Sequence, residues 1–245
     1  MSAHSNPDRI VVLFKGGRLP TWHALSPAAR KEYEQLHVDL MLDIARRHQL
    51  LHLEGFRLLS PQDSYERFWT IHFPTTDDAR AWIEAEMEPP YGSYGYYEYD
   101  LAVPHRTQEL NAWVTNPSPA PSSTDADPSQ VPALSVDPNS LVVLRFERWR
   151  GEAFELNPPG RGETTAEEAA RAVAQQHGLM RLECFALLGP RANWHRVWLG
   201  EFPDLASAEA WIDTWSQQPH GRHLQQHFHL TRKWAPHYFA TWVSH

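Results

Sequence analysis

The sequence predicts an α+β protein built from two copies of one β-α-β-β-α-β unit. Two observations support this prediction: the halves of the chain align with each other without a gap, and both carry the same succession of strand-like and helix-like hydrophobic periodicities. The chain has 245 residues, of which 42% are hydrophobic. That length and composition are typical of a folded globular protein with one large core or two small ones.

The internal repeat covers most of both halves. A shift of 129 residues places 46–114 on 175–243, and 21 of these 69 positions are identical. Within this stretch LHLEGFRLLSP matches MRLECFALLGP, and both halves carry Phe-Pro followed by Ala-x-Ala-Trp-Ile. Upstream, IVVL at 10–13 meets LVVL at 141–144 with a shift of 131. Gapless similarity of this length indicates a duplication.

A Pro/Ser-rich segment separates the repeats. Residues 115–139 contain six Pro and five Ser and no aromatic residue, so they cannot bury enough apolar surface to fold alone. The sequence therefore predicts a disordered N-terminus at 1–9, repeat 1 at 10–114, a linker at 115–139 and repeat 2 at 140–245.

The first strand and helix of repeat 1 follow from local signals. The β-branched run at 10–14 predicts a strand. Ser26 before Pro27 is a favourable start for a helix, whose apolar residues recur at helical spacing as far as His48.

The rest of the unit follows the same logic. Apolar runs at 50–59 and 65–73 predict a hairpin. Thr76 or Asp77 is expected to cap the next helix, and alternation near 94–103 predicts the last strand.

The second repeat gives the same order of elements. A strand is expected at 141–146, Thr165 is the expected helix cap, and Gly178 suits a left-handed position at the end of that helix. Alternation near 223–232 predicts its last strand.

The order β-α-β-β-α-β is that of a ferredoxin-like unit, whose antiparallel sheet carries both helices on one face. Two tandem units can cover their open faces by packing the sheets face to face, as an intramolecular α/β barrel. Together with the F-P-x(4)-A-x-A-W-I pattern and the W-x-x-L…Y entry to the first helix at 20–33, this order resembles the dimeric α/β-barrel superfamily, and in particular its uncharacterised members, here as a single-chain fusion.

This resemblance implies a range of activities. The superfamily includes cofactor-free monooxygenases, lactone isomerases, polyketide cyclases, haem enzymes of the chlorite dismutase type and proteins without known activity. Because one fold carries all of these, the site must be argued from its own residues.

Composition excludes several classes of function. The net charge is −8 and no Lys/Arg cluster stands out, which excludes a non-specific nucleic-acid binder. A single cysteine, Cys184, excludes an internal disulfide and a multi-Cys zinc site. No signal-peptide core or membrane-length apolar run is present, so we expect a cytoplasmic protein with a small-molecule ligand. A monomer is possible because the expected barrel closes within one chain.

Polar residues on one face of the last and third strands form the first candidate site. Alternation places Glu98 and Asp100 opposite the helix-packed face, and His72 of repeat 1 aligns with Glu201 of repeat 2. A mixture of histidine and carboxylate suits general acid–base chemistry. The expected catalytic residues are His72, Glu201, Asp100 and His229. The alternative is a set of polar residues at a wet sheet edge.

Aromatic residues suggest where a substrate would bind. The first β-α loop of repeat 1 carries Trp22 and His23 and is placed to close over a pocket. Further tyrosines at 33, 91, 94 and 96 add aromatic surface to the same repeat. The expected substrate-binding residues are Trp22, His23, Tyr96, Glu98, Trp69 and Trp198. The alternative for the two tryptophans is an ordinary place in the core.

Histidines near the C-terminus suggest a metal. His227 and His229 point to the same side of a strand and can chelate an ion, with His223, Glu201 or His195 as a third ligand. The alternatives are surface histidines without a metal, or a haem whose axial ligand is His227 or His229.

Two residue pairs recur in both repeats: Glu54 with Arg67, and Glu183 with Arg196. Adjacent antiparallel strands can bring such residues together, so an ion pair at each hairpin is expected.

The sequence thus favours a cofactor-free enzyme of the isomerase, cyclase or cofactor-independent oxygenase type. It is expected to act on a hydrophobic or aromatic organic substrate in the pocket between the sheets, by His/carboxylate acid–base chemistry. The first alternative is a non-catalytic ligand-binding or stress-related barrel protein. The second is a metal- or haem-dependent barrel enzyme.

Overall fold

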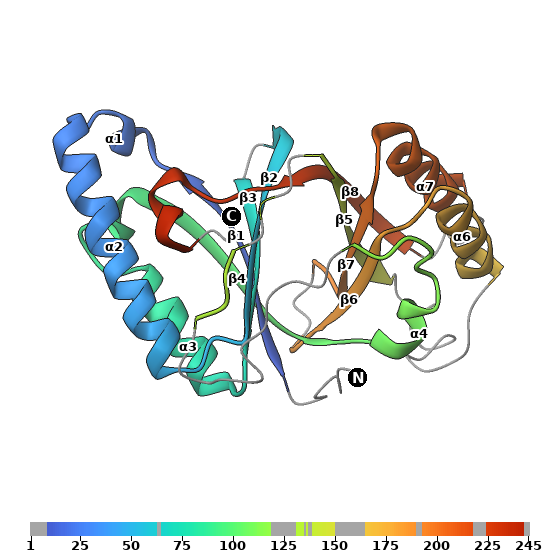
Figure 1. Cartoon of the computed structure of the whole chain (residues 1–245), viewed down its shortest axis with the longest axis horizontal. Coiled ribbons are helices and arrows are strands. Elements are labelled where there is room, and N and C mark those ends of the chain that lie inside the picture. The colour runs from blue at the N-terminus through green and yellow to red at the C-terminus, as the bar shows by residue number, and fades with distance from the viewer. Residues whose placement is uncertain are drawn as a thin grey trace. The chain divides into compact units, whose positions relative to one another are not determined.

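The computed structural model describes residues 9–62, 65–118, 131–134, 136, 139–149, 165–189, 193–217 and 224–242. These residues form two compact units (Figure 1). Unit 1 comprises the described residues of Met1–Val103, Pro121–Asp137 and Lys233–His245, and unit 2 those of Pro104–Ala120 and Pro138–Arg232. Both combine helices with antiparallel strands, which confirms the predicted α+β class.

Unit 1 contains one four-stranded antiparallel sheet. Its strands are β1 (Ile10–Arg18), β2 (His52–Gln62), β3 (Tyr65–Phe73) and β4 (Gly95–Pro104). They pair in the order β2-β3-β1-β4. In this register Phe14 lies opposite both Trp69 and Tyr99, so these three side chains share one face.

The helices of unit 1 begin at short polar caps. They are α1 (Pro20–His23), α2 (Pro27–Arg47), α3 (Thr76–Glu86) and the single turn η1 (Gly92–Tyr94). Ser26 accepts a hydrogen bond from the Ala29 N–H, as the sequence predicts. The cap of α3 is Thr75, whose side chain accepts from the Asp78 N–H, so the expected cap at Thr76 or Asp77 is wrong by one or two residues. Thr75 is the last residue with extended backbone, and the cap requires that conformation.

The core of unit 1 lies between the sheet and helices α2 and α3, which cover one face of it (Figure 1). Helix α2 contributes Met41 and Ile44, α3 contributes Trp82, and β3 contributes Trp69. The C-terminal turn η3 (His237–Trp242) adds further aromatic rings to the same core.

Unit 2 repeats this arrangement. Its elements are α4 (Thr107–Asn111), β5 (Leu141–Trp149), α6 (Thr165–Gln176), β6 (Arg181–Leu187), β7 (Arg196–Phe202), α7 (Leu205–Gln217) and β8 (Leu224–Lys233). The strands pair in the order β6-β7-β5-β8, which is the order of unit 1. Gly178 has a φ of +67°, the predicted left-handed conformation after α6. None of the helices described here is both long and apolar enough to cross a membrane.

The ends of the two repeats are exchanged. Trp113, near the end of the first repeat, is buried in the core of unit 2. Trp242, its counterpart, is buried in the core of unit 1, where its backbone carbonyl accepts from the Leu134 N–H. The predicted N-terminal segment up to residue 8, linker residues 119–130, and His220 and His223 lie outside the described residues.

Candidate active site

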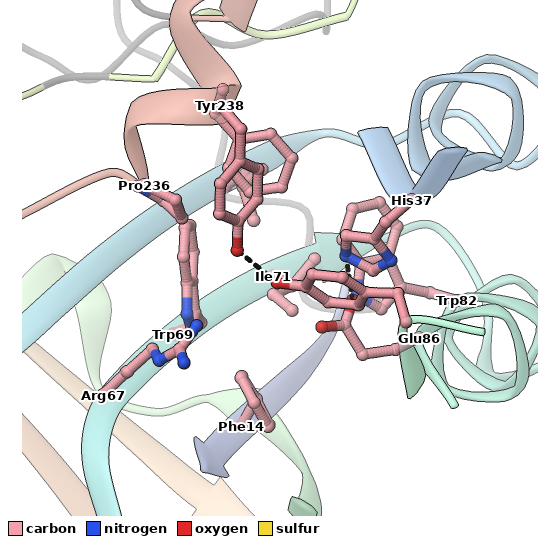
Figure 2. A pocket seen from close by; sticks show the side chains of 12 residues that line it. Phe14, His37, Arg67, Trp69, Ile71, Trp82, Glu86, Pro236 and Tyr238 are labelled. Atoms are coloured by element: carbon pink, nitrogen blue, oxygen red, sulfur yellow. Dashed lines mark hydrogen bonds and ion pairs between the residues drawn. The ribbon is translucent and has the colours of Figure 1, made fainter. Parts of the chain in front are cut away.

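A small aromatic cavity opens between the sheet of unit 1 and its helices (Figure 2). Its volume is about 30 Å³. The lining is mostly aromatic, with three ionisable side chains; it consists of Phe14, His37, Leu53, Arg67, Trp69, Ile71, Trp82, Glu86, Tyr91, Pro236, Tyr238 and Phe239.

Regular spacing brings these residues together. Arg67, Trp69 and Ile71 alternate along β3 and therefore point to the same face of the sheet. Trp82 and Glu86 are four residues apart on α3, so they lie one turn apart on the side of the helix that faces the cavity. The remaining wall comes from α2, β1 and the C-terminal segment.

His37 and Glu86 form the polar centre of the site. The distance from His37 Nε2 to Glu86 Oε2 is 3.5 Å, and the imidazole stacks on Tyr91 with 3.8 Å between ring centroids. Burial raises the pKa of Glu86 to about 7, against the opposing charges of Arg18 and Arg67. Burial, aided by the same two arginines, lowers the pKa of His37 to about 3. At neutral pH the imidazole is therefore uncharged and the carboxyl exchanges its proton readily.

Hydroxyl and guanidinium groups complete the site. The Tyr91 and Tyr238 hydroxyls are hydrogen-bonded to each other. Arg67 donates from Nε and Nη2 to Glu66 Oε1, at 3.2 and 3.1 Å, and its guanidinium also lines the cavity. Figure 2 shows Arg67 on one side of the cavity and Glu86 with His37 on the other. This arrangement can transfer a proton close to a positive charge.

The predicted residues of unit 1 lie in several places. Trp69 lines the cavity, and Trp22 borders it through an edge contact with Tyr91, at 5.4 Å between ring centroids. His23 is exposed at the end of α1. His72 lies on the other face of the sheet, where its ring meets that of His52 at 5.0 Å.

Three more of the expected residues belong to β4. Glu98 and Asp100 face Lys15, with 2.9 and 3.8 Å from Lys15 Nζ to their carboxylate oxygens. Tyr96 is partly exposed, at 36%. Glu98 and Asp100 point away from the helix-covered face, as the alternation predicts.

The predicted residues of unit 2 are also spread over both faces of the sheet. The His227 and His229 rings are 4.4 Å apart, on the face opposite the helices. Glu201 accepts from Ser118 Oγ at 3.5 Å and lies 3.7 Å from Arg181 Nε. Trp198 belongs to the helix-side core and donates to Glu147 Oε2 at 3.0 Å.

Two expectations do not survive. Glu54 pairs across the strands with Thr70, so it points to the opposite face from Arg67, and the predicted ion pair between Glu54 and Arg67 is wrong. Within the described part of the chain, no three His, Cys, Asp or Glu side chains converge as a metal site would need. A metal held by His227, His229 and either Glu201 or His195 is therefore not formed.

Sequence reasoning missed His37 and Glu86. Both sit on helices, and no motif marks them. The available signal was the repeat itself, because Glu86 aligns with Trp215 at the shift of 129 residues, in a helix whose other apolar positions are kept.

Similar solved structures place the chain in a fold class. The chain has an α+β fold similar to that of chlorite dismutase from Candidatus Nitrospira defluvii, as three of the similar solved structures show. A variant of that enzyme with one substitution is 13% identical, with 94% of this chain and 92% of that chain covered and a TM-score of 0.65. A double variant is 12% identical, with 98% and 97% covered and a TM-score of 0.68. The complex with imidazole is 12% identical, with 94% and 92% covered and a TM-score of 0.62.

At this level of identity the likeness shows the fold alone. No protein-family model and no curated protein matches the sequence. The resemblance stated above counts enzymes of the chlorite dismutase type among haem enzymes, so the haem alternative is compared with the residues of this chain.

The described residues do not fit a haem inside either unit. A haem needs an axial ligand beside a cavity that admits the macrocycle. The unit 1 cavity has a volume of about 30 Å³, whereas sites for whole organic ligands have volumes of several hundred Å³, so the macrocycle does not fit. In unit 2 the matching space is filled by Trp198, Trp211 and Trp215, between 0% and 3% exposed, and the described core there contains no histidine.

Proposed function

We propose that this protein is an enzyme that moves a proton on a small organic substrate at the unit 1 cavity, as isomerases and cyclases do. The observation that carries the proposal is the Glu86–His37 pair, whose carboxyl has a pKa of about 7 and faces a cavity that Arg67 also lines. A carboxyl with a pKa near the working pH both accepts and returns a proton efficiently. The aromatic walls favour a hydrophobic or aromatic substrate, and a cavity of about 30 Å³ admits only the reacting end of it.

The proposed step balances without a cofactor. The substrate is a carbonyl compound with a double bond between its β and γ carbons. Glu86, as carboxylate, takes a proton from the α carbon; the electron pair of that C–H bond forms a C=C bond, and the π pair of the carbonyl group moves onto its oxygen. Arg67 stabilises the resulting oxyanion by its charge. Protonated Glu86 then returns the proton to the γ carbon while the carbonyl group re-forms, which gives the conjugated isomer. His37 does not exchange protons in this scheme; it is a positioning residue that holds the Glu86 carboxyl.

Deuterium exchange tests this proposal without knowledge of the natural substrate. The protein is incubated in D₂O with a panel of aliphatic and aromatic carbonyl compounds, and loss of the C–H signal is followed by NMR. Glu86→Gln is expected to slow exchange by about 10²- to 10⁴-fold. The matched control is Glu84→Gln, an exposed residue of the same helix, which should leave the rate unchanged.

Two outcomes would contradict the proposal. If Glu86→Gln keeps the wild-type rate, the base lies elsewhere, and His72→Gln, Asp100→Asn, Glu201→Gln and His229→Gln then test the residues expected from the sequence. If panel compounds bind but none exchanges, the protein is a non-catalytic ligand-binding protein.

We further propose that the two units are ferredoxin-like repeats of one duplicated ancestor, packed sheet to sheet as a barrel within one chain. The shared strand order and the gapless internal alignment support this arrangement. Sedimentation equilibrium is expected to give a monomer. A stable dimer would argue for barrels completed between chains.

A further inference from the structure

Arg18 is a half-buried cation beside the aromatic wall of the cavity. It is the last residue of β1, and its guanidinium lies 3.6 Å from the ring centroid of Tyr91 and 4.6 Å from that of Trp22. In the described part of the chain no carboxylate oxygen comes within 4.0 Å of it, and its Nη1 is buried without a hydrogen bond. Enclosing a guanidinium without a counter-ion is unfavourable, so an anion at this place would be stabilising.

Arg67 lines the cavity itself, whereas Arg18 stacks on Tyr91, one of the lining residues. The Nε and Nη2 of Arg67 donate to Glu66, which leaves Nη1 for another acceptor. Both arginines act electrostatically on His37 and on Glu86, and Arg67 also disfavours the charge of Arg18. Gly16 lies opposite Arg67, so Arg18, two residues further along β1, shares the face of the paired strands β1 and β3 that carries Arg67.

Glu86, Tyr238 and Tyr97 favour the charge of Arg18 electrostatically, but in the described part of the chain no carboxylate forms an ion pair with it. On α2, Glu34 lies 3.5 Å from His237 of the C-terminal segment. On β3, Glu66 is engaged by Arg67, and on α3, Glu86 faces His37. The electrostatic balance of the site thus favours a ligand with a negative charge.

We propose that the substrate of this site is a small organic acid, whose carboxylate is held by Arg67 and Arg18. This inference rests on the proposed function and specifies its substrate class. A carboxylate is planar and has two acceptor oxygens, which match the fork of a guanidinium. Tyr238 lines both the cavity and an outer groove of about 490 Å³ along α2, so the body of the acid has room beyond the tyrosine.

Calorimetric titration of the full chain tests this inference. The probes are benzoate and propionate, with methyl benzoate as the uncharged analogue and inorganic phosphate as a non-organic anion. Benzoate or propionate is expected to bind, and the ester to bind at least about tenfold more weakly. Arg18→Met and Arg67→Met should each weaken carboxylate binding by about 10- to 100-fold. Arg80→Met, a matched change on the exposed side of α3, should not change it.

Three results would overturn the inference: equal binding of benzoate and methyl benzoate, binding of phosphate but of neither carboxylate, or unchanged binding by both arginine variants. Thermal unfolding guards against a misfolded variant. Benzoate should raise the Tm of the wild type but not that of Arg18→Met. Arg18→Lys, which keeps the charge, should retain part of the shift.

The two proposals fail separately. Binding is measured without turnover, so Glu86→Gln is expected to lose deuterium exchange and still bind benzoate. Carboxylate binding without any Glu86-dependent exchange would refute the proposed function alone. Exchange of neutral carbonyl compounds with no preference for acids would refute the acid as substrate class alone.

Discussion

At aligned positions of their cores, unit 1 has a cavity and unit 2 has packed side chains. In unit 1, Phe14 and Glu86 border an open cavity. In unit 2 the aligned positions are Arg145 and Trp215, and the Arg145 guanidinium lies 3.6 Å from the Trp215 ring centroid. The framework around them is shared, with Trp69 and Trp82 of unit 1 matched by tryptophans in unit 2. These two aligned positions are among those that distinguish the filled core of unit 2 from the core with a cavity in unit 1.

The two units also differ in whether their arginine side chains form ion pairs with carboxylates. Arg145 is 0% exposed, and its Nη2 lies 2.8 Å from Glu147 Oε2 while its Nε donates to Gln226 at 2.6 Å. Unit 1 has Gly16 where unit 2 has Glu147, and a Cβ at Gly16 would lie 2.6 Å from the Tyr96 carbonyl oxygen. The buried charge of Arg145 in unit 2 is thus neutralised by Glu147. In unit 1, by contrast, no carboxylate of the described residues forms an ion pair with Arg18. Satisfied networks stabilise a fold, and incompletely satisfied ones mark candidate sites.

The substitution with the largest expected effect on stability is Arg145→Ala in unit 2. The change leaves Glu147 buried without its main partner, so the free energy of unfolding should fall by about 3–5 kcal/mol. Urea denaturation followed by tryptophan fluorescence measures the loss. The double variant Arg145→Met/Glu147→Gln removes both charges and should cost clearly less. Equal losses in the two variants would mean that the ion pair itself contributes nothing.

The pH dependence of stability sharpens the comparison, because Trp215 cannot titrate where Glu86 does. The folded-state pKa of Glu86, about 7, is above its usual 4.5, so its contribution to stability is full below pH 4.5 and is lost as the pH rises to 7. That window corresponds to about 3 kcal/mol. Between pH 4 and pH 8, Glu86→Gln should therefore gain about 3 kcal/mol of unfolding free energy relative to the wild type.

The stability of Glu86→Gln must be compared with that of the wild type, because His37 contributes a pH dependence of its own. Its folded-state pKa of about 3 is below the usual 6.5, so its own contribution is present above pH 6.5 and is lost as the pH falls towards 3. The two slopes oppose each other in the wild type, and only the difference between wild type and variant isolates Glu86. Urea titrations at several pH values measure it. A difference that stays constant with pH would refute the raised pKa.

The smallest expected effect compares helix caps. Thr75 caps α3 through the Asp78 N–H, and Thr75→Ala should cost about 1 kcal/mol. In unit 2, Asp204 accepts from the Ser207 N–H at 2.8 Å, and this backbone hydrogen bond lowers its pKa. The effect of Asp204→Ala should therefore shrink as the pH falls through that pKa, whereas the loss from Thr75→Ala should depend on pH much less. Thermal unfolding at pH 3 and pH 7 separates the two.

The order of elements was accessible from the sequence because strand and helix periodicities are local. Strand β4 shows this, since alternation correctly placed Glu98 and Asp100 away from the helices. The cap of α3 was missed by one or two residues, because Thr75, Thr76 and Asp77 are all good caps and only the backbone conformation decides among them.

The residues that line the cavity were harder to predict from the sequence. Trp69 was expected at a binding site, and it lines the cavity. His37 and Glu86 meet only because α2 and α3 turn particular faces towards each other, and helical periodicity does not specify which residues of two helices come into contact. Tyr238 reaches the cavity from a position about 150 residues later than Tyr91, a long-range contact that local patterns do not encode.

The exchange of chain ends has an evolutionary consequence. Each half of the gene encodes the closing tryptophan of the other half's core: Trp113 for unit 2 and Trp242 for unit 1. A recombination event that separated the halves would leave two products, each with a hole in its core and an orphaned aromatic end. Each half of the chain therefore depends on the end of the other half to complete its core.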